Sequence, residues 1–210
     1  MARYREAKCR LCRREEMKLF LKGMRCNTEK CPFTKRPYPP GFHGRARAKK
    51  ASYYALQLRE KQKTKNIYGL LERQFRRFFS IASKSRGATG KVLIQLLERR
   101  LDNVIYRALF ALSRSQARQL VRHGFVFSGA KRVDIPSYLV ASGQTIEIKG
   151  NDDVLKSIRG IAEENTKDRS IAGWLTVDNS ALKITVSRLP EREDVAMAIN
   201  EQLIVELYSK

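Results

Sequence analysis

All four cysteines of this 210-residue chain lie within its first 31 residues, spaced as C-x2-C, thirteen residues, then C-x4-C. Two close pairs separated by a short segment can bring four sulfurs around one ion, and four thiolates in a tetrahedron form a closed, structural zinc site. We therefore predict one structural Zn²⁺ on Cys9, Cys12, Cys26 and Cys31. Four cysteines also suit an iron–sulfur cluster, and the spacing does not separate the two.

The surroundings of these cysteines favour a metal over a disulfide framework. Basic neighbours such as Lys8, Arg10 and Arg25 would offset the charge of four thiolates. The first forty residues are too few and too charged to fold by burial alone, so the ion would replace a core. The N-terminus MARYREAKC has no apolar signal region, so we expect a cytoplasmic chain in which thiols stay reduced.

The net charge of +22, from 43 Lys and Arg against 21 Asp and Glu, indicates a polyanionic partner. The net charge is +12 over residues 1–50, +9 over 51–100, +4 over 101–150 and −3 over 151–210, so the first half should grip that partner. The candidate partners are nucleic acid and an acidic membrane surface, and no apolar run approaches the ~18–20 residues of a membrane span. Hydrophobic residues make up 42% of the chain, enough for a core.

Hydrophobic periodicity predicts helices, followed by strands, with the two kinds of element segregated along the chain. The expected helices cover residues 13–21, 45–63, 66–82, 91–112, 114–123 and 151–170, with a helical tail over 191–210. Two strands should flank a tight turn at Gly129-Ala130, a further strand should cover 144–149, and a hairpin should cover 174–190. Segregation of this kind is typical of an α+β fold rather than a doubly wound sheet.

One predicted helix carries a row of arginines. Arg114, Arg118 and Arg122 lie at i, i+4 and i+8, and Ser113 with Gln116 forms a capping box at the start of that helix. No acidic residue stands at i±4, so the row is predicted to bind backbone phosphates rather than to be an ordinary solvated face. Lys131 and Arg132, just after the tight turn, extend this surface.

Aromatic residues alternate with basic ones in the front half, a composition suited to stacking on exposed RNA bases, although several of them could instead pack in a core. They are Tyr38, His43, Tyr53, Tyr54 and Tyr68. The proline run near Tyr38 is either a rigid linker or, flanked by Lys35, Arg36 and Arg45, a rigid arm that contacts RNA.

No enzymatic motif is present. His43 and His123 have no evident nucleophile partner, and the phosphate-binding loops and the nucleophile elbow are absent. We therefore predict a protein that is not an enzyme and has no small-molecule substrate.

Several stretches in one order resemble a known family over essentially the whole chain. They are MARYR, the four cysteines, KRPYPPGFHG, YGLLERQFRRFF, ERRLDNVIYRALFALSRSQARQLVRHG, VDIPSYLV and NEQLIVELYSK. Together they resemble the bacterial family of small-subunit ribosomal protein number four, in its four-cysteine, zinc-binding type, the family that defines the S-four RNA-binding module.

The resemblance implies a cytoplasmic protein of the small ribosomal subunit. It implies binding to the 5′ part of 16S rRNA, nucleation of subunit assembly, contact with small-subunit ribosomal protein number five and an influence on translational accuracy. Some members also bind messenger RNA and repress their own synthesis. The implied domains are a cysteine knuckle with a proline-rich arm (1–45), a helical domain (46–98), an S-four-type module (99–161), and a hairpin with a helical tail (162–210).

The resemblance also assigns RNA contacts within the module, at positions matching the family motif. These are Arg100, Asn103, Arg107, Arg114, Gln116, Arg118, Gln119 and His123. Arg122, Lys131, Arg132 and the aromatic residues above are predicted to contact RNA as well. A further set of predicted contacts lies in the front half of the chain. These are Arg3, Tyr4, Arg5, Lys8, Arg10, Arg13, Arg14, Lys22, Lys35, Arg36, Arg45, Arg47, Lys49, Lys50, Arg59, Lys61, Lys63, Lys65, Arg73, Arg76, Lys84, Arg86 and Arg99.

Two positions depart from the family pattern. The hairpin turn, often Asn-Gly, is Ser128-Gly129-Ala130 here, where Gly129 can still supply a positive φ. Phe125 stands where a histidine is common, which puts one contact in doubt.

Two alternative functions use the same module. One is an RNA-modifying enzyme, which would need a catalytic domain that the remaining residues hardly allow, and the other is a translational repressor or stalled-ribosome factor.

Overall fold

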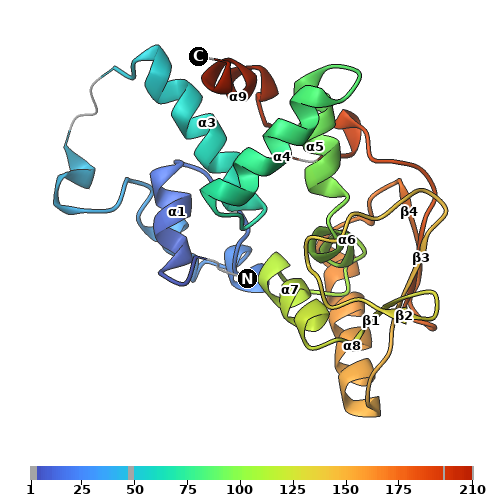
Figure 1. Ribbon diagram of the computed structural model, residues 1–210. Helices are drawn as coiled ribbons and strands as arrows, with labels where there is room; N and C mark the ends of the chain where they lie inside the picture. The colour runs from blue at the N-terminus through green and yellow to red at the C-terminus, as the bar shows by residue number, and fades with distance from the viewer. Residues whose placement is uncertain (1–3, 47–49, 196, 210) are drawn as a thin grey trace. The chain divides into compact units, whose positions relative to one another are not determined.

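The computed structural model describes residues 4–46, 50–195 and 197–209, and the chain divides into two compact units. Unit 1 comprises Met1–Leu93 with Met197–Lys210, and unit 2 comprises Ile94–Ala196. Figure 1 shows helices in both units and strands only in the second. In the described part of the chain, no helix is long and apolar enough to cross a membrane.

Short helical pieces make up the front of unit 1. They are α1 (Lys8–Arg14), η1 (Gly23–Cys26), α2 (Pro32–Lys35) and η2 (Phe42–Arg45). The helix expected over 13–21 is wrong: α1 begins and ends earlier. Glu16 and Phe20 have φ of 53° and 51°, and this left-handed backbone cannot continue an α-helix.

Two longer helices, α3 (Tyr53–Ile67) and α4 (Glu72–Lys84), form the body of unit 1. Of the helix expected over 45–63, positions 47–49 lie outside the described residues, and the described helix begins at Tyr53, where the Ser52 hydroxyl caps it by accepting from the Ala55 N–H. Gly69 has φ +64°, and the Gly69 and Leu70 N–H groups donate back into the last turn of α3. This Schellman ending stops α3 and separates it from α4. The helix expected over 66–82 is therefore interrupted: its first two residues belong to α3, and α4 begins at Glu72.

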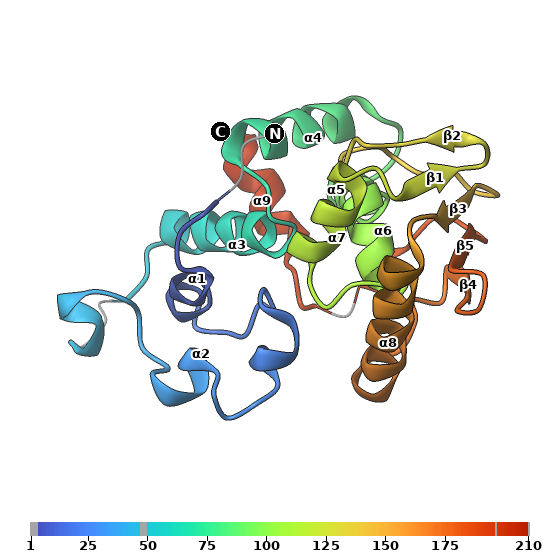
Figure 2. The same cartoon turned by 90° about the horizontal axis from the view of Figure 1, so that it is seen from below.

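The apolar residues of α4 form one stripe. Phe75, Phe78 and Ala82 are buried, Phe79 is half-buried, and Leu71 caps the helix from an extended backbone. The end of the chain returns to this unit as α9 (Glu201–Tyr208), which lies beside α3 in both views (Figures 1 and 2). The Tyr208 ring stacks on Phe79 with centroids 4.5 Å apart.

The helix expected over 91–112 is two helices, α5 (Thr89–Glu98) and α6 (Leu101–Arg107). The break occurs because Arg100 is extended and pairs with Leu139, while the Leu101 and Asp102 N–H groups donate to the carbonyls of Tyr138 and Pro136. The orphan donors at the start of a helix are thus satisfied by a distant loop, which helical periodicity does not reveal.

Helix α6 ends earlier than expected because Leu109 adopts φ +67° and forms a second Schellman ending. Asn165, from α8 (Asp152–Asp168), donates to the Leu109 carbonyl at 2.7 Å and so supports this strained residue. The left-handed conformation is uncommon for leucine, so its side chain gives no sequence signal for the turn.

Helix α7 (Arg114–Arg122) confirms the predicted cap and stop. Ser113 accepts from the Gln116 N–H, although the Gln116 side chain accepts from Leu112 rather than from the cap residue. Gly124, at φ +78°, ends the helix. The tight turn is also confirmed, with Gly129 at φ +58° between β1 (Val126–Ser128) and β2 (Lys131–Arg132). Strand β2 is shorter than expected: after Arg132 one more hydrogen bond to β1 follows, from the Val133 N–H to the Val126 carbonyl, at 2.9 Å.

The five strands form one antiparallel sheet in the order β2-β1-β3-β5-β4 (Figure 2). The remaining strands are β3 (Thr145–Ile148), β4 (Leu175–Asp178) and β5 (Lys183–Val186), and η3 (Arg192–Asp194) follows them. Alternate residues such as Ile146 and Ile148 join a core with α6, α7 and α8 that includes the fully buried Trp174. The late hairpin predicted for 174–190 therefore completes this sheet.

The α+β prediction is confirmed, with a helical first unit and a sheet packed on helices in the second. The finer predicted boundaries at 45/46, 98/99 and 161/162 stay predictions. The returning α9 makes unit 1 discontinuous in sequence.

Candidate nucleic-acid interface and cysteine pocket

The four cysteines line one pocket at the front of unit 1, together with Lys8, Lys22 and Arg25. Cys9 and Cys12 are one turn apart on α1, Cys26 ends η1, and Cys31 precedes α2, whose first residue is Pro32. All four are free thiols, and three of them are buried. The local fold thus brings together the two pairs that the sequence spacing identified.

The pKa values of the thiols are shifted in different directions by their surroundings. Burial, followed by the charges of the neighbouring cysteines, raises the pKa of the Cys12 thiol, and burial likewise raises that of Cys26. Burial acts to raise the pKa of Cys31 as well, but hydrogen bonds from the Thr34 and Phe33 N–H groups outweigh it and lower that pKa. Cys31 is therefore the thiol of these three that ionises most readily.

As the side chains stand, no three Cys, His, Asp or Glu residues of the described ranges form a group that could hold an ion. The donor set nevertheless fits a structural metal, because four unbridged sulfurs and basic residues line one pocket. The metal therefore stays a prediction and is taken up below.

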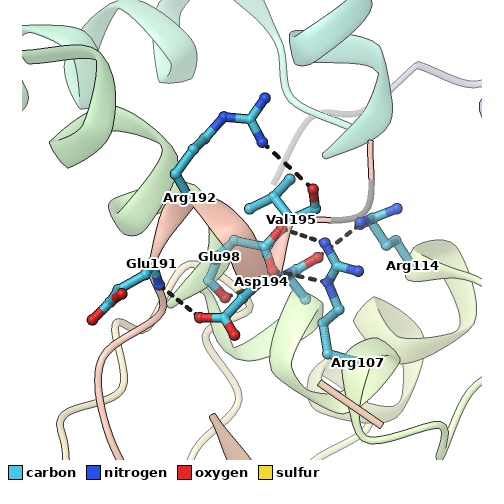
Figure 3. A network of polar contacts seen from close by, with 8 residues as sticks. Glu98, Arg107, Arg114, Glu191, Arg192, Asp194 and Val195 are labelled. Carbon is cyan, nitrogen blue, oxygen red and sulfur yellow. Dashed lines mark hydrogen bonds and ion pairs between the residues drawn. The ribbon is translucent and has the colours of Figure 1, made fainter. Parts of the chain in front are cut away.

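Within unit 2, a fully buried carboxylate organises the start of the module (Figure 3). Glu98 accepts two hydrogen bonds from the Arg107 guanidinium, at 2.9 and 2.7 Å, and a third from the Asn103 amide at 2.7 Å. The Arg114 Nε donates in turn to the Asn103 oxygen at 2.8 Å. A bidentate pair with no exposed carboxylate surface fixes the side chains that surround it.

Two arginines lie close to the Tyr106 ring. The Arg114 guanidinium is 4.4 Å from the ring centroid, and that of Arg169 is 4.7 Å from it. Cation–π contacts of this kind hold both guanidinium planes against the ring. Arg114 therefore belongs to the framework of the module as much as to its surface.

A second buried carboxylate corrects the expected arginine row. Asp102 pairs with Arg100 through two hydrogen bonds, at 3.1 and 2.7 Å, and lies 3.7 Å from Arg118 Nη1. The exposed fractions of Arg100 and Arg118 are 1% and 7%. Arg118 is thus on the side of α7 that α6 covers, and the acidic partner absent at i±4 comes from another helix. The prediction of one continuous exposed row is wrong; of its three members, only Arg122 is exposed.

Three more residues that were predicted to contact RNA are also buried. Asn103 is 1% exposed, Tyr68 is 3% exposed, and Lys61 is 8% exposed with its amine 2.8 Å from Glu72. These side chains are engaged in the interior of their units, which corrects the expectation that they stand on the surface. Burial of Tyr68 agrees with the alternative that some of the aromatic residues pack in a core.

An exposed basic group remains at the end of α7. Arg132 donates through Nη2 to the His123 carbonyl at 3.1 Å, which ties the β1–β2 hairpin to the end of this helix. Gln119, Arg122, His123, Lys131 and Arg132 are all exposed. The hairpin and the helix end thereby offer one surface with several cationic side chains, separate from the buried pairs.

In unit 1, the proline-rich arm is held by arginines. Arg13 donates to the Tyr38 and Pro39 carbonyls, at 2.9 and 3.2 Å, and Arg45 donates to the Tyr38 hydroxyl at 3.2 Å. Both guanidinium groups also lie about 5 Å from the Tyr38 ring. Tyr38 therefore serves as a support for the arm.

Most other predicted contact residues are at least partly accessible. The exposed ones are Arg5, Arg10, Arg14, Lys22, Lys35, Arg36, His43, Arg45, Lys50, Tyr53, Tyr54, Arg73, Arg76, Lys84 and Arg86, in addition to the five at the end of α7. The half-buried ones are Tyr4, Lys8, Arg13, Tyr38, Arg59, Lys63, Lys65, Arg99, Arg107, Arg114 and Gln116. Arg3, Arg47 and Lys49 lie outside the described residues.

Sequence reasoning missed Glu98 and Asp102, the carboxylates that hold the module's arginines, and Phe42, a phenylalanine that is 97% exposed. A carboxylate between apolar residues, as in LLERRLDNV, was a signal for the first two. The Gly41-Phe42 pair after two prolines was a signal for the third.

Comparison with known proteins agrees with this architecture. Residues 3–98 match the family described as ribosomal protein S4/S9 N-terminal domain, and residues 99–146 match the S4 domain. Relatives named small ribosomal subunit protein uS4 are 56% identical in Thermodesulfovibrio yellowstonii, 55% in Dictyoglomus turgidum and 52% in Thermus thermophilus, in each case over the full length of both chains.

The matches confirm the core of the sequence-based interpretation. The chain has the RNA-binding S4 domain of a structural, rRNA-binding protein of the cytoplasmic small ribosomal subunit, with rRNA and ribosomal proteins as its partners. The prediction that it is not an enzyme is confirmed, and the alternative of an RNA-modifying enzyme is wrong. On these matches, the chain belongs to the uS4 family of small-subunit ribosomal proteins.

Proposed function

We propose that this protein binds the 5′ part of 16S rRNA directly, nucleates assembly of the small subunit and influences translational accuracy together with small-subunit ribosomal protein number five. The observation that carries the proposal is the exposed cationic surface at the end of α7. There Arg122, Lys131 and Arg132 are accessible, whereas Arg100 and Arg107 are engaged by buried carboxylates.

The physical basis is a division between supporting and contacting groups. Phosphate contacts supply affinity and orientation, and they require cations that are free to meet the RNA backbone. Glu98 and Asp102 take up Arg107 and Arg100, so those pairs stiffen the platform. The exposed arginines then meet a folded RNA from a surface that is already formed, which lowers the ordering cost of binding.

Zn²⁺ is proposed on Cys9, Cys12, Cys26 and Cys31, with an iron–sulfur cluster as the less favoured alternative. The donor set and its pocket support the assignment. Four thiolates leave no open coordination position, so the ion would act only as a structural cross-link between α1, η1 and α2. Messenger RNA stays a predicted second RNA partner, with repression of its own synthesis as the predicted consequence.

The test is a binding titration of the full chain against the 5′ part of 16S rRNA and an unrelated structured RNA of equal length, at two salt concentrations. We expect a preference for the ribosomal fragment that survives the higher salt. Equal affinity for both RNAs, lost together as salt rises, would mean that the +22 charge alone drives binding and would contradict the proposal.

A further inference from the structure

Phe42 is the most exposed large apolar side chain of the described residues, at 97% accessibility. Phenylalanine is among the residues most often buried, because exposing its ring to water is costly. The other exposed large hydrophobic side chains of the described residues, such as Tyr54 and Ile135, are between 39% and 57% exposed. An almost fully accessible ring therefore requires a reason.

The loop that carries this ring is fastened on both sides. Before it, the carbonyls of Tyr38 and Pro39 accept from Arg13. After it, Arg45 donates back to the Tyr38 hydroxyl. These contacts come from side chains on either side of the loop, so Phe42 sits at the tip of a braced turn.

The turn itself is closed tightly. Gly41 has φ +109°, and its carbonyl accepts from the Gly44 N–H at 3.2 Å. A Cβ at position 44 would lie 2.0 Å from the Pro39 carbonyl oxygen, so the backbone passes too close for any residue other than glycine. The backbone of such a turn has little conformational freedom left to lose when its exposed ring binds a partner.

The charge around the turn indicates which class of partner this ring meets. From Lys30 to Arg59 the sequence contains eight basic residues and no Asp or Glu. Lys35, Arg36, His43 and Arg45 are exposed near the turn. A basic segment with no carboxylates of its own favours a polyanion, and an aromatic ring within it suits a base, which offers a flat π-face between phosphates.

We propose that Phe42 is a stacking residue that receives one unpaired base of the 16S rRNA, an inference that rests on the proposed function. The flanking cations hold the RNA backbone, and the ring covers the base face. Position 42 thereby adds an apolar contact beside the exposed cations of this segment.

The test compares three substitutions in the full chain, with binding to the 5′ part of 16S rRNA as the measurement. Phe42→Ala is expected to weaken binding roughly 5- to 150-fold, the range for loss of one base–aromatic stack, with an unchanged salt slope. Phe42→Leu keeps an apolar side chain without a π-face and should weaken binding similarly. Phe42→Trp should retain binding. Ile81→Ala, at an exposed apolar position on α4, is the control and should bind as wild type.

A second readout uses fluorescence. The chain has one tryptophan, the fully buried Trp174, so Phe42→Trp introduces an accessible emitter. Its emission should be quenched by the ribosomal fragment, while that of the wild-type chain should change little.

The outcomes separate the two proposals. Wild-type affinity for Phe42→Ala, or full retention by Phe42→Leu, would overturn stacking while leaving the proposed function intact. Unchanged RNA binding combined with poorer incorporation into small subunits would show that Phe42 meets a ribosomal protein, and would also overturn stacking. Failure of the wild-type chain to prefer the ribosomal fragment would overturn the proposed function, and this inference with it.

Discussion

At the scale of single residues, arginines in unit 2 have two roles that sequence alone does not separate. Arg118 and Arg122 share a helix face by spacing, yet one lies against Asp102 and the other is exposed. Helical periodicity indicates which residues share a face, but the packing of α6 decides which part of that face is covered. The candidate surface was therefore predictable as a region, and its individual members were not.

Substitution of these two arginines should have different effects, one on the free energy of unfolding and the other on RNA binding. Arg118→Ala is expected to lower the free energy of unfolding by about 2–4 kcal/mol, because it removes a buried partner of Asp102. Arg122→Ala, the matched control on the same helix, should change that free energy by less than about 0.5 kcal/mol but lower the salt slope of RNA binding by about one. Denaturant unfolding and salt-dependent titration measure the two effects. A stable Arg118→Ala protein with a reduced salt slope would contradict this assignment.

At the scale of elements, sequence located most helices and the strands but misplaced several ends. The stripe on α4, the Ser113 cap and the Gly124 stop were predictable because each has a local signature. The helix breaks at Arg100 and Leu109 were not predictable from the sequence, because a distant loop and a buried asparagine stabilise them. Local rules predict an element's existence and type, whereas tertiary contacts set its boundaries here.

The attachment of α9 to unit 1 should depend on pH on the alkaline side. Burial, together with a hydrogen bond to Glu72, raises the pKa of Tyr208 above its usual value. Above about pH 10 the unfolded chain loses this proton while the folded chain keeps it, so stability is complete below that pH and falls as pH rises through the raised pKa.

Tyr208→Phe isolates this effect, because it removes the titrating hydroxyl and keeps the ring that stacks on Phe79. Wild type should lose stability more steeply above pH 10, by up to about 1.4 kcal/mol per pH unit relative to the variant. Thermal unfolding of both proteins between pH 8 and 11 measures the difference. Parallel curves would show that Tyr208 titrates equally in both states.

At the scale of the whole molecule, the two units are stabilised in different ways. Unit 2 has a continuous core of helices and sheet that includes Trp174. The first forty residues of unit 1 have few buried side chains, chiefly Leu19 and three of the cysteines. The composition of that segment predicted this contrast, since many charges and few apolar residues leave little surface to bury.

This contrast leads to a prediction for metal removal. If the four cysteines hold Zn²⁺, chelation should unfold residues 4–46 and weaken RNA binding, because the ion supplies cross-links that burial does not. Unit 2 should keep its fold, since its core contains none of the cysteines.

Amide spectra before and after chelation would show loss of dispersion confined to the front segment, reversed when Zn²⁺ is restored. A Cys12→Ser, Cys26→Ser double variant should resemble the chelated protein at all times. Unchanged front-segment amide signals after complete removal of the metal would mean that Arg13, Tyr38 and the short helices hold this region without it.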